Sequence, residues 1–577
     1  MSKLLMGDRY IGLILLATIL GICAGQMAPA QLPTATIAGV VKDSSGAVIP
    51  GVAVSATNSE TGLIRSAQTG NDGAYRFPAL AVGIYNVRAE HPGFQAKVQQ
   101  GLRIAVGDEA LLNFTLDVGA VTETVSVTAE APLVNTTSGT LGSLVSEERV
   151  ADLPLDGRNF NDLTLLQTGV SENRATGTTG ALNGTVFSSN GAPTRSNLFM
   201  LDGTIMNDLL NIGPASSNEN TLGVEGIREY RVVTNSFSAE YGMTMGSQVT
   251  LVSKNGTNGL HGSLFEYLRN SALDARNWTD IPNKPAFRRN NFGASLGGPI
   301  RHDQAFYFVT YEGLRQARGV TLVGTVPTLA ARQDLGLVPK IAESVKPYLA
   351  QFPFPNGPDL GQGIARYFNP VKEVDREDYG QGRMDYTLSN SDTLFGRYTR
   401  TQSGKVFPAV FPQVISDFPT RNHWTTLSEN HIFSPTLLAT FRASFSRMRT
   451  LSVFTKIDFP PELAFAPGQP MGGLGIGGLS DFGPRGVTPT VLNQRIFSLS
   501  DDMFYTRGRH SLKFGTLINF YRQLVGNGGG AAPRGSWGTW PSAPGAPPAP
   551  ARFLSAPDTH SLSSASHSAP WSCRGIL

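Results

Sequence analysis

The sequence has few cysteines, few charges and no late apolar run, and each shortage excludes a class of protein. Its two cysteines, Cys23 and Cys573, stand near opposite ends of 577 residues, so no disulfide or redox site is expected in the body. Charged residues are only 16%, and 47 Lys and Arg against 44 Asp and Glu give a net charge of +3. The sequence has no cluster of basic residues of the kind that nucleic-acid binding needs, so no nucleic-acid partner is expected. No apolar run beyond the N-terminal segment reaches the roughly 18 residues of a membrane helix.

Motifs of catalysis and metal binding are missing as well. The histidines of the body lie far apart, without the H-E-x-x-H or H-x-x-E spacing that holds zinc. They are His91, His261, His302, His423, His431 and His510. There is no G-x-S-x-G, no Walker-type phosphate loop and no G-x-G-x-x-G after a strand. We therefore expect no catalytic residue, no metal and no cofactor, and a protein that is not an enzyme.

The first 30 residues have the pattern of a cleaved signal peptide. A basic start precedes the apolar run Ile11–Ile22, which is too short to cross a bilayer. Small residues follow, and cleavage after Ala30 or after Gly25 fits the pattern. Cys23 suggests a lipoprotein signal, but Ile22 occupies the position where that signal needs a small residue. Residues 1–30 therefore predict export.

Residues 37–118 read as a small β-sandwich. Short alternating strands are separated by Gly, Pro, Asp and Asn turns. The predicted strands are 37–41, 52–58, 75–77, 84–90, 95–104 and 110–116. The motifs at Gly39–Val52, Asn71–Phe77 and Gly83–Val87 resemble the carboxypeptidase regulatory-like domain. Asp43, Gly46, Asp72 and Gly73 could form a ligand cluster, but at strand ends these residue types favour turns.

The segment Val224–Arg269 is the most informative part of the chain. Arg231–Thr234 and Gln248–Ser253 are β-branched runs that predict two strands. Asn-Gly pairs within Asn255–Gly259 predict tight reversals after them. On this local pattern alone, a generic α+β domain and a specialised one are equal alternatives, and the spacing of the motifs favours the second.

That spacing resembles the plug domains of TonB-dependent receptors, in the Oar-like branch. These plugs read I-x-E-x-x-V, S-A-E-Y-G, a Gly-rich strand and K-x-G-T-N. The matching residues here are Ile227, Glu229, Val232, Ser238–Gly242, Gly246, Lys254 and Gly256–Asn258. The resemblance implies a receptor in the cell outer membrane of a Gram-negative bacterium. Its implied partners are outer-membrane lipid, the barrel assembly machinery, a TonB-type energy transducer and an unknown substrate, with carbohydrate suggested by the sandwich.

Two further motifs place the plug at residues 139–260. Leu153–Phe160, LPLDGRNF, and Asn197–Gly203, NLFMLDG, are similar to plug motifs of the same family. Between them, Ser171–Thr194 is rich in Gly, Ser, Thr and Asn, which predicts a mobile loop.

The linker at residues 119–138 holds a candidate TonB box, the extended segment through which such receptors are pulled. The candidate residues are Glu123, Thr124, Val125, Ser126, Val127, Thr128 and Ala129. An extended Val- and Thr-rich peptide can join the sheet edge of a partner through main-chain hydrogen bonds. An ordinary last strand of the sandwich is an equal alternative.

From residue 261 the pattern is that of membrane strands. In Leu437–Arg447 the odd positions are apolar and the even ones polar except Leu438, and Ser511–Tyr521 repeats the alternation. One face suits lipid and the other a wet lumen. The further predicted strands are 262–268, 290–298, 304–313, 379–388, 392–401, 422–432 and 493–505. We expect a partial antiparallel transmembrane β-barrel over residues 261–526.

Nine strands are fewer than the roughly 22 of plugged transporters, so the chain is expected to be an incomplete, non-transporting fragment. Residues 527–577 differ in character, since the 50 residues from Gly528 include 33 Gly, Ala, Pro or Ser. We expect a disordered, low-complexity tail without paired strands, resembling out-of-frame translation.

The predicted fold is thus mostly β: a β-sandwich, a small α+β plug, a partial barrel and a tail. The favoured function is a TonB-dependent receptor that imports a substrate, an oligosaccharide or peptide by analogy with the sandwich. The alternative is a surface adhesion or carbohydrate-binding β-protein. Outward apolar faces on 437–447 and 512–520 would favour the receptor.

Overall fold

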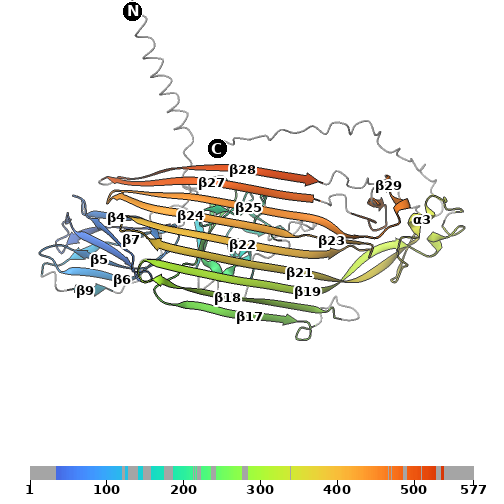
Figure 1. Cartoon of the computed structure of the whole chain (residues 1–577), viewed down its shortest axis with the longest axis horizontal. Helices are drawn as coiled ribbons and strands as arrows, with labels where there is room; N and C mark the ends of the chain where they lie inside the picture. Colours follow the sequence, from blue (N-terminus) through green and yellow to red (C-terminus); the bar gives the residue numbers. More distant parts are fainter. Residues whose placement is uncertain are drawn as a thin grey trace, which may run out of the picture.

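A computed structural model describes most of the chain, and Figure 1 shows its main units. The described residues are 34–119, 124–127, 141–146, 158–173, 186–211, 213–214, 216, 223–235, 242–275, 284–337, 339–465, 467–468, 471–484, 490–507, 510–527 and 535–537. The predicted signal peptide, Leu153–Gly157, Ser238–Tyr241, and most of the linker and tail lie outside them. In the described part, no helix has the length and apolarity to cross a membrane.

The sandwich consists of two facing sheets, as predicted. One has the order β4-β1-β7, with β8 also pairing with β1, and the other β3-β2-β5-β6-β9. The strands are β1 (Thr34–Asp43), β2 (Ala53–Asn58), β3 (Ile64–Gln68), β4 (Ala74–Ala81), β5 (Gly83–Glu90), β6 (Ala96–Ile104), β7 (Glu109–Leu111), β8 (Phe114–Leu116) and β9 (Thr124–Val127). Alternate side chains such as Ile37, Val54 and Val87 fill the core, because successive strand residues face opposite sides.

Two sandwich predictions were wrong and one is confirmed. The sequence did not predict β3, whose side chains are exposed or half-buried and so lack an apolar run. The expected strand 110–116 is two strands, β7 and β8, that pair with successive parts of β1. Asp43 forms a turn as predicted, since its Oδ1 accepts hydrogen bonds of 2.9 Å from the N–H groups of Ser45 and Ala47.

A smaller sheet, called the plug sheet here, has the order β10-β15-β16-β13-β14. Its strands are β10 (Leu141–Val145), β13 (Leu198–Leu201), β14 (Thr204–Ile205), β15 (Ile227–Asn235) and β16 (Gln248–Ser253). β15 and β16 confirm the two strands predicted from β-branched runs. The helices described here are 3₁₀ turns, η2 (Phe160–Leu166) and η4 (Val224–Gly226).

The predicted mobile loop Ser171–Thr194 is wrong at both ends. β11 (Val170–Glu172) and β12 (Phe187–Ser189) pair as an antiparallel hairpin. Phe187 is buried and packs edge-on against Phe199 at 6.0 Å between ring centroids. Apolar contact therefore orders ends that composition alone marked as loop.

The third unit, called the large sheet here, contains 11 strands and carries all nine predicted membrane strands. The long strands are β17 (His261–Asn270), β18 (Phe287–Arg301), β19 (Ala305–Pro327), β21 (Ile364–Thr387), β22 (Asp392–Pro408), β24 (Thr420–Ser434), β25 (Leu437–Ile457), β27 (Thr490–Arg507) and β28 (His510–Asn527). The expected length of about ten residues was wrong for most, since β19 and β21 have 23 and 24. They extend beyond the band that lipid would cover.

The connections at the two ends of the large sheet differ in length. At the sandwich end, hairpins such as β24–β25 and β27–β28 turn within two residues, whereas residues 328–363 and 458–489 link strands at the other end. The long connections carry η5 (Ala330–Arg332), α3 (Lys346–Leu349), β20 (Asp359–Gly361), η6 (Pro461–Leu463) and β26 (Leu474–Ile476), and the shorter connection at residues 409–419 carries β23 (Val414–Asp417). They pack around Phe352, Phe411 and Phe482. Short turns mark the periplasmic side of such sheets and long loops the extracellular side.

Side chains of the large sheet alternate as predicted. On β25 the polar Thr440, Arg442 and Ser446 are buried, whereas Phe441 is 46% exposed. On β28, Leu512, Phe514, Ile518 and Phe520 are exposed as well. These outward apolar faces favour the receptor over the soluble adhesion protein.

The large sheet does not close into a barrel in the described part of the chain. Within the described residues, β17 pairs only with β18 and β28 only with β27, so the sheet is open.

The expectation of no paired strand after Gly528 was wrong, because β29 (Gly535–Trp537) pairs in parallel with β26. A tail rich in Gly and Ser can still add a three-residue strand where a loop offers an open edge.

Candidate functional site

The plug sheet contacts the inward face of the large sheet, and a buried ion pair crosses the contact. Asp202, just after β13, accepts a hydrogen bond of 2.6 Å from Arg397 Nε of β22. Both side chains are 1% exposed or less. Trp424, Met448 and Ile496 of the large sheet join the same apolar cluster as the plug strands. The two sheets therefore share one core with a charge pair inside it.

Each partner of this ion pair is held by further hydrogen bonds. Ser253 donates to Asp202 from its N–H at 3.0 Å and from Oγ at 2.7 Å. Arg397 donates to Leu201 O at 3.0 Å and Thr426 Oγ1 at 2.6 Å. A buried charge needs such partners, because it has lost its water.

Nearby arginines reinforce the negative charge of Asp202. Arg383 Nη1 lies 3.8 Å from its Oδ1. Burial raises the pKa of the Asp202 carboxyl, but Arg397, Arg383 and the Ser253 hydrogen bonds together bring that pKa below its ordinary value. The carboxylate is therefore ionised at neutral pH.

Gly203 allows a third arginine to come close. Its φ of +78° is left-handed, and a Cβ there would lie 1.9 Å from Arg442 Nη1 of β25. Only glycine fits such a position without moving the guanidinium. The Asp-Gly of the NLFMLDG motif thus provides both the anion and the space around it.

A second polar cluster joins the LPLDGRNF motif to the large sheet. Arg158 Nη2 bonds Glu225 Oε1 at 2.8 Å, and its Nε lies 3.9 Å from Glu312 Oε2 of β19. Glu312 also accepts from the N–H of Glu225 at 2.9 Å. The guanidinium covers the Phe265 ring at 4.1 Å, a cation–π contact. Two plug segments are therefore tied to β19 by charge.

The sandwich docks on the opposite side, on β15 of the plug sheet. Glu229, of the I-x-E-x-x-V motif, accepts a hydrogen bond of 2.7 Å from the N–H of Val106. Arg228 Nη2 bonds Glu60 Oε2 at 2.6 Å, and Arg231 bonds Val106 O. Burial raises the pKa of Glu229 to about 7, against opposing effects of the Val106 N–H and Arg228. This contact contains a titratable group.

The structure places part of the candidate TonB box in the sandwich. Thr124–Val127 form β9, which pairs in parallel with Ala96–Gln99 of β6. Glu123, Thr128 and Ala129 lie outside the described residues. Within the described part, β9 is the last strand of its sheet, so one of its edges is open. The alternative of a final sandwich strand describes its position, and a role in coupling stays a prediction.

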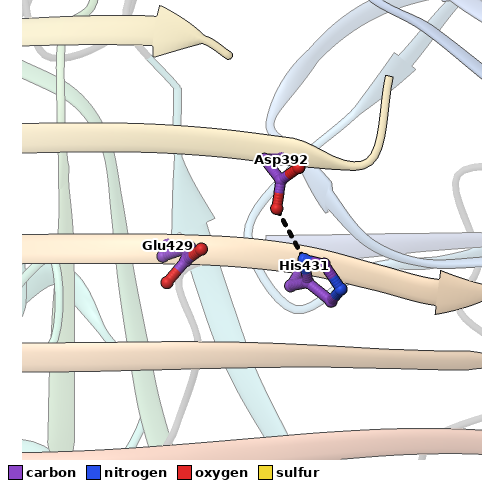
Figure 2. A group of neighbouring side chains, drawn as sticks. All are labelled: Asp392, Glu429 and His431. Atoms are coloured by element: carbon purple, nitrogen blue, oxygen red, sulfur yellow. Dashed lines mark hydrogen bonds and ion pairs between the residues drawn. The ribbon is translucent and has the colours of Figure 1, made fainter. Parts of the chain in front are cut away.

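One group with metal-ligand chemistry, which sequence reasoning missed, lies on the outer face of the large sheet. Asp392 of β22 and Glu429 and His431 of β24 bring ligand atoms within 4.8 Å of one another (Figure 2). The sequence gives little signal, because the two strands are 37 residues apart at this pair of positions, Asp392 to Glu429. Asp392 Oδ1 is already bonded to His431 Nδ1 at 2.5 Å. We regard the group as a local hydrogen-bonded cluster at the short-turn end.

The ion pairs of the plug were also missed by sequence reasoning. Both plug motifs were found, but their charged partners Arg397 and Glu312 were not. Asp202 and Arg397 are 195 positions apart, and no local periodicity connects them. The available signal was a charge on the lumen-facing side of a predicted strand, where the buried positions are odd on β22, as for Arg397, and even on β19, as for Glu312.

Comparison with known families identifies two regions. Residues 252–564, more than half of the chain, match the outer membrane beta barrel domain. Residues 36–117 match the carboxypeptidase regulatory-like domain. The first match runs past residue 526 into the segment expected to be a low-complexity tail.

Individual relatives agree with these matches. The TonB-dependent transporter Oar of Myxococcus xanthus is 26% identical over 366 residues, which cover 59% of this chain and 33% of that protein. Solved structures include the outer membrane transporter YddB from Escherichia coli, at 12% identity and a TM-score of 0.45. The siderophore receptor PirA from Acinetobacter baumannii is similar at 16% identity and 0.42. Each comparison covers 67% of this chain and 49% of that structure. The chain thus spans a third of the curated relative and about half of these structures.

Proposed function

Because the chain belongs to the outer-membrane β-barrel family and resembles the Oar-like TonB-dependent receptors, we propose that it forms the sandwich, plug and first barrel strands of an energy-coupled importer. Membership of this family places it in the outer membrane of a Gram-negative bacterium. The observation that carries the proposal is the buried Asp202–Arg397 pair across the plug and the large sheet.

The arrangement suits controlled passage of a substrate. A plug sheet attached to the lumen face by Asp202–Arg397 and by Arg158–Glu312 stays in place until these contacts are broken. A charge left unpaired inside a protein is costly, so displacement of the plug needs an external energy source. A TonB-type transducer would supply it, and the barrel assembly machinery would insert the sheet. The substrate we propose is an oligosaccharide or peptide, on the analogy of the sandwich alone.

β9 supports the proposed coupling. A strand with an open edge presents unpaired N–H and C=O groups to which another strand can add. Thr124–Val127 has such an edge and precedes the plug sheet, whose first strand begins at Leu141. We therefore propose this segment as the transducer contact.

Proline substitutions in β9 test this contact. Successive N–H groups of a strand point to opposite sides, so of Val125→Pro and Ser126→Pro one removes a donor toward β6 and the other a donor toward the open edge. The variant that loses the donor toward the open edge should bind the purified periplasmic domain of the transducer at least about tenfold more weakly, a loss of about 1.4 kcal/mol.

Val125→Ala is the matched control, because it keeps the main-chain donor. It should bind the transducer domain like the unchanged chain. Unchanged binding by both proline variants would remove β9 from the proposal and leave the final-strand interpretation.

The open sheet leads to a second part of the proposal: the 577-residue chain by itself does not transport. Two unpaired edges in hydrocarbon cost several kcal/mol for each unsatisfied backbone group. In the bilayer, or without detergent, we expect aggregation of the chain or its degradation to a soluble sandwich of about residues 37–118. Heat-modifiable migration on a gel, or substrate-stimulated uptake by cells carrying this chain alone, would contradict it.

A further inference from the structure

A row of four arginines and one histidine crosses the outward face of the large sheet. Register pairing runs from Arg400 of β22 to His423 of β24, then to Arg447 of β25, Arg495 of β27 and Arg522 of β28. Each residue is directly opposite the next, and the five strands lie side by side in Figure 1. Neighbouring strands are about 4.8 Å apart, so the row is continuous. We call these five residues the cation row.

The next outward positions add to the positive charge. Two residues farther along each strand toward the long loops, the side chains on the same face are again directly opposite one another. They are Gln402, Arg421, Arg449, Asn493 and Leu524. The ten positions together hold six arginines, one histidine and no acid. The acid next to them on β21, Asp378, is bonded to Arg315 at 2.6 Å.

The cations have few partners within the protein. Arg400 donates to Gln402 Oε1 at 2.9 Å, and Tyr398 Oη lies 2.8 Å from His423 Nδ1. Within the described residues, Arg447, Arg495 and Arg522 form no ion pair. So many like charges in one row repel one another unless an external anion lies among them.

Aromatic residues border the cation row on the side of the short turns. The residues that are directly opposite one another there are Tyr398, Thr425, Phe445, Phe497 and Phe520. The Phe445 and Phe497 rings are 4.7 Å apart. A groove of about 340 Å³ is lined by members of both rows, including His423, Arg447, Arg495, Phe445 and Phe497. One wall is cationic and the other apolar, as an amphiphile with an anionic head requires.

The height of the cation row locates it in the membrane. Arg447 is ten residues from Leu437, where β25 begins at the short-turn end. At about 3.4 Å per residue and a tilt of about 40°, ten residues rise about 25 Å, the height of the apolar band of such sheets. The row therefore lies at the boundary next to the long loops, which is the outer leaflet.

We propose that the cation row binds the phosphates of the outer-leaflet glycolipid, a phosphorylated lipid of the lipid A type. Arginine forks pair with phosphate oxygens in two parallel hydrogen bonds, and the acyl chains of the lipid would lie over the aromatic row and the apolar residues below it. This site is on the opposite face of the sheet from the plug. It does not depend on the proposed import function.

Binding of lipid A to the purified full chain in nonionic detergent tests the proposal. The double variant Arg447→Gln/Arg495→Gln should bind diphosphoryl lipid A at least about tenfold more weakly, since it removes two charge-assisted contacts. The unchanged chain should bind monophosphoryl lipid A more weakly than the diphosphoryl form. Titration followed by native mass spectrometry measures both.

Arg507→Gln is the matched control. Arg507 is an exposed cation on the same strand and, by its odd position, the same face as Arg495, but at the short-turn end. It should leave lipid A binding unchanged. Equal loss in this control, or unchanged binding in the double variant, would overturn the proposal. So would equally tight binding of inorganic phosphate or phosphatidylglycerol, which would make the row a general anion surface.

Discussion

The two contacts of the plug sheet use charge in different ways. Toward the large sheet, Asp202 and Arg397 are fully buried and each has further hydrogen bonds. Toward the sandwich, Arg228 and Glu60 are partly exposed, at 12% and 26%, and the more buried Glu229 has a raised pKa. Solvent screens the second contact and not the first. The Asp202–Arg397 pair is thus little affected by salt or by pH near neutrality, whereas the sandwich contact responds to both.

The largest expected effect comes from breaking the buried pair. Asp202→Asn keeps the size of the side chain but leaves the Arg397 charge unpaired in the core. We expect the free energy of unfolding to fall by about 3–5 kcal/mol. Urea unfolding of the detergent-solubilised chain measures it.

Two further variants sharpen this test. Glu109→Gln removes a partly exposed pair with Arg76 in the sandwich and should cost about 1 kcal/mol at most. Adding Arg397→Gln to Asp202→Asn should restore part of the loss, because no charge is then left unpaired. A loss no larger than that of Glu109→Gln would show that Asp202 and Arg397 are not buried together.

A smaller effect is expected from pH at the sandwich contact. The pKa of Glu229 is raised from 4.5 to about 7 in the docked state, so between these values the docked state binds more protons than the undocked one. Docking should therefore be strongest below the ordinary pKa and weaken as pH rises through about 7. The change should be about 1–3 kcal/mol. Release of the sandwich by limited proteolysis across this range measures it.

Substitutions separate Glu229 from its neighbours. Glu229→Gln mimics the protonated carboxyl and should give docking that no longer depends on pH. Arg228→Gln should weaken docking by about 1 kcal/mol at most and keep the pH dependence. A flat profile in the unchanged chain would contradict the role of Glu229.

Sequence reasoning succeeded where the information was local. Alternation in Leu437–Arg447 predicted β25, and β-branched runs predicted β15 and β16, since each pattern lies within one strand. It failed on β3, whose side chains are too polar to give a pattern, and on the full length of β19 and β21. In the remaining parts of those strands, arginines such as Arg315 and Arg376 share the outward face with small and apolar residues, so no regular apolar alternation marks them.

The candidate site was only partly predictable, because its contacts join distant segments. Arg158 and Asp202 were found as parts of motifs, yet nothing in the chain identifies Glu312 or Arg397 as their partners. The cation row needs the register of five strands, in which Arg400 and Arg522 are 122 positions apart. Even a correct list of strands does not supply that register.

The parallel pairing of β9 with β6 has a mechanical consequence. A force along the axis of Thr124–Val127 loads all hydrogen bonds of this short ladder together, in shear. A force perpendicular to that axis opens the same bonds one after another, like a zipper, and needs less tension at any moment. The resistance of β9 to detachment therefore depends on the direction of pull, and the same four residues can be a firm anchor in one direction and a release point in another.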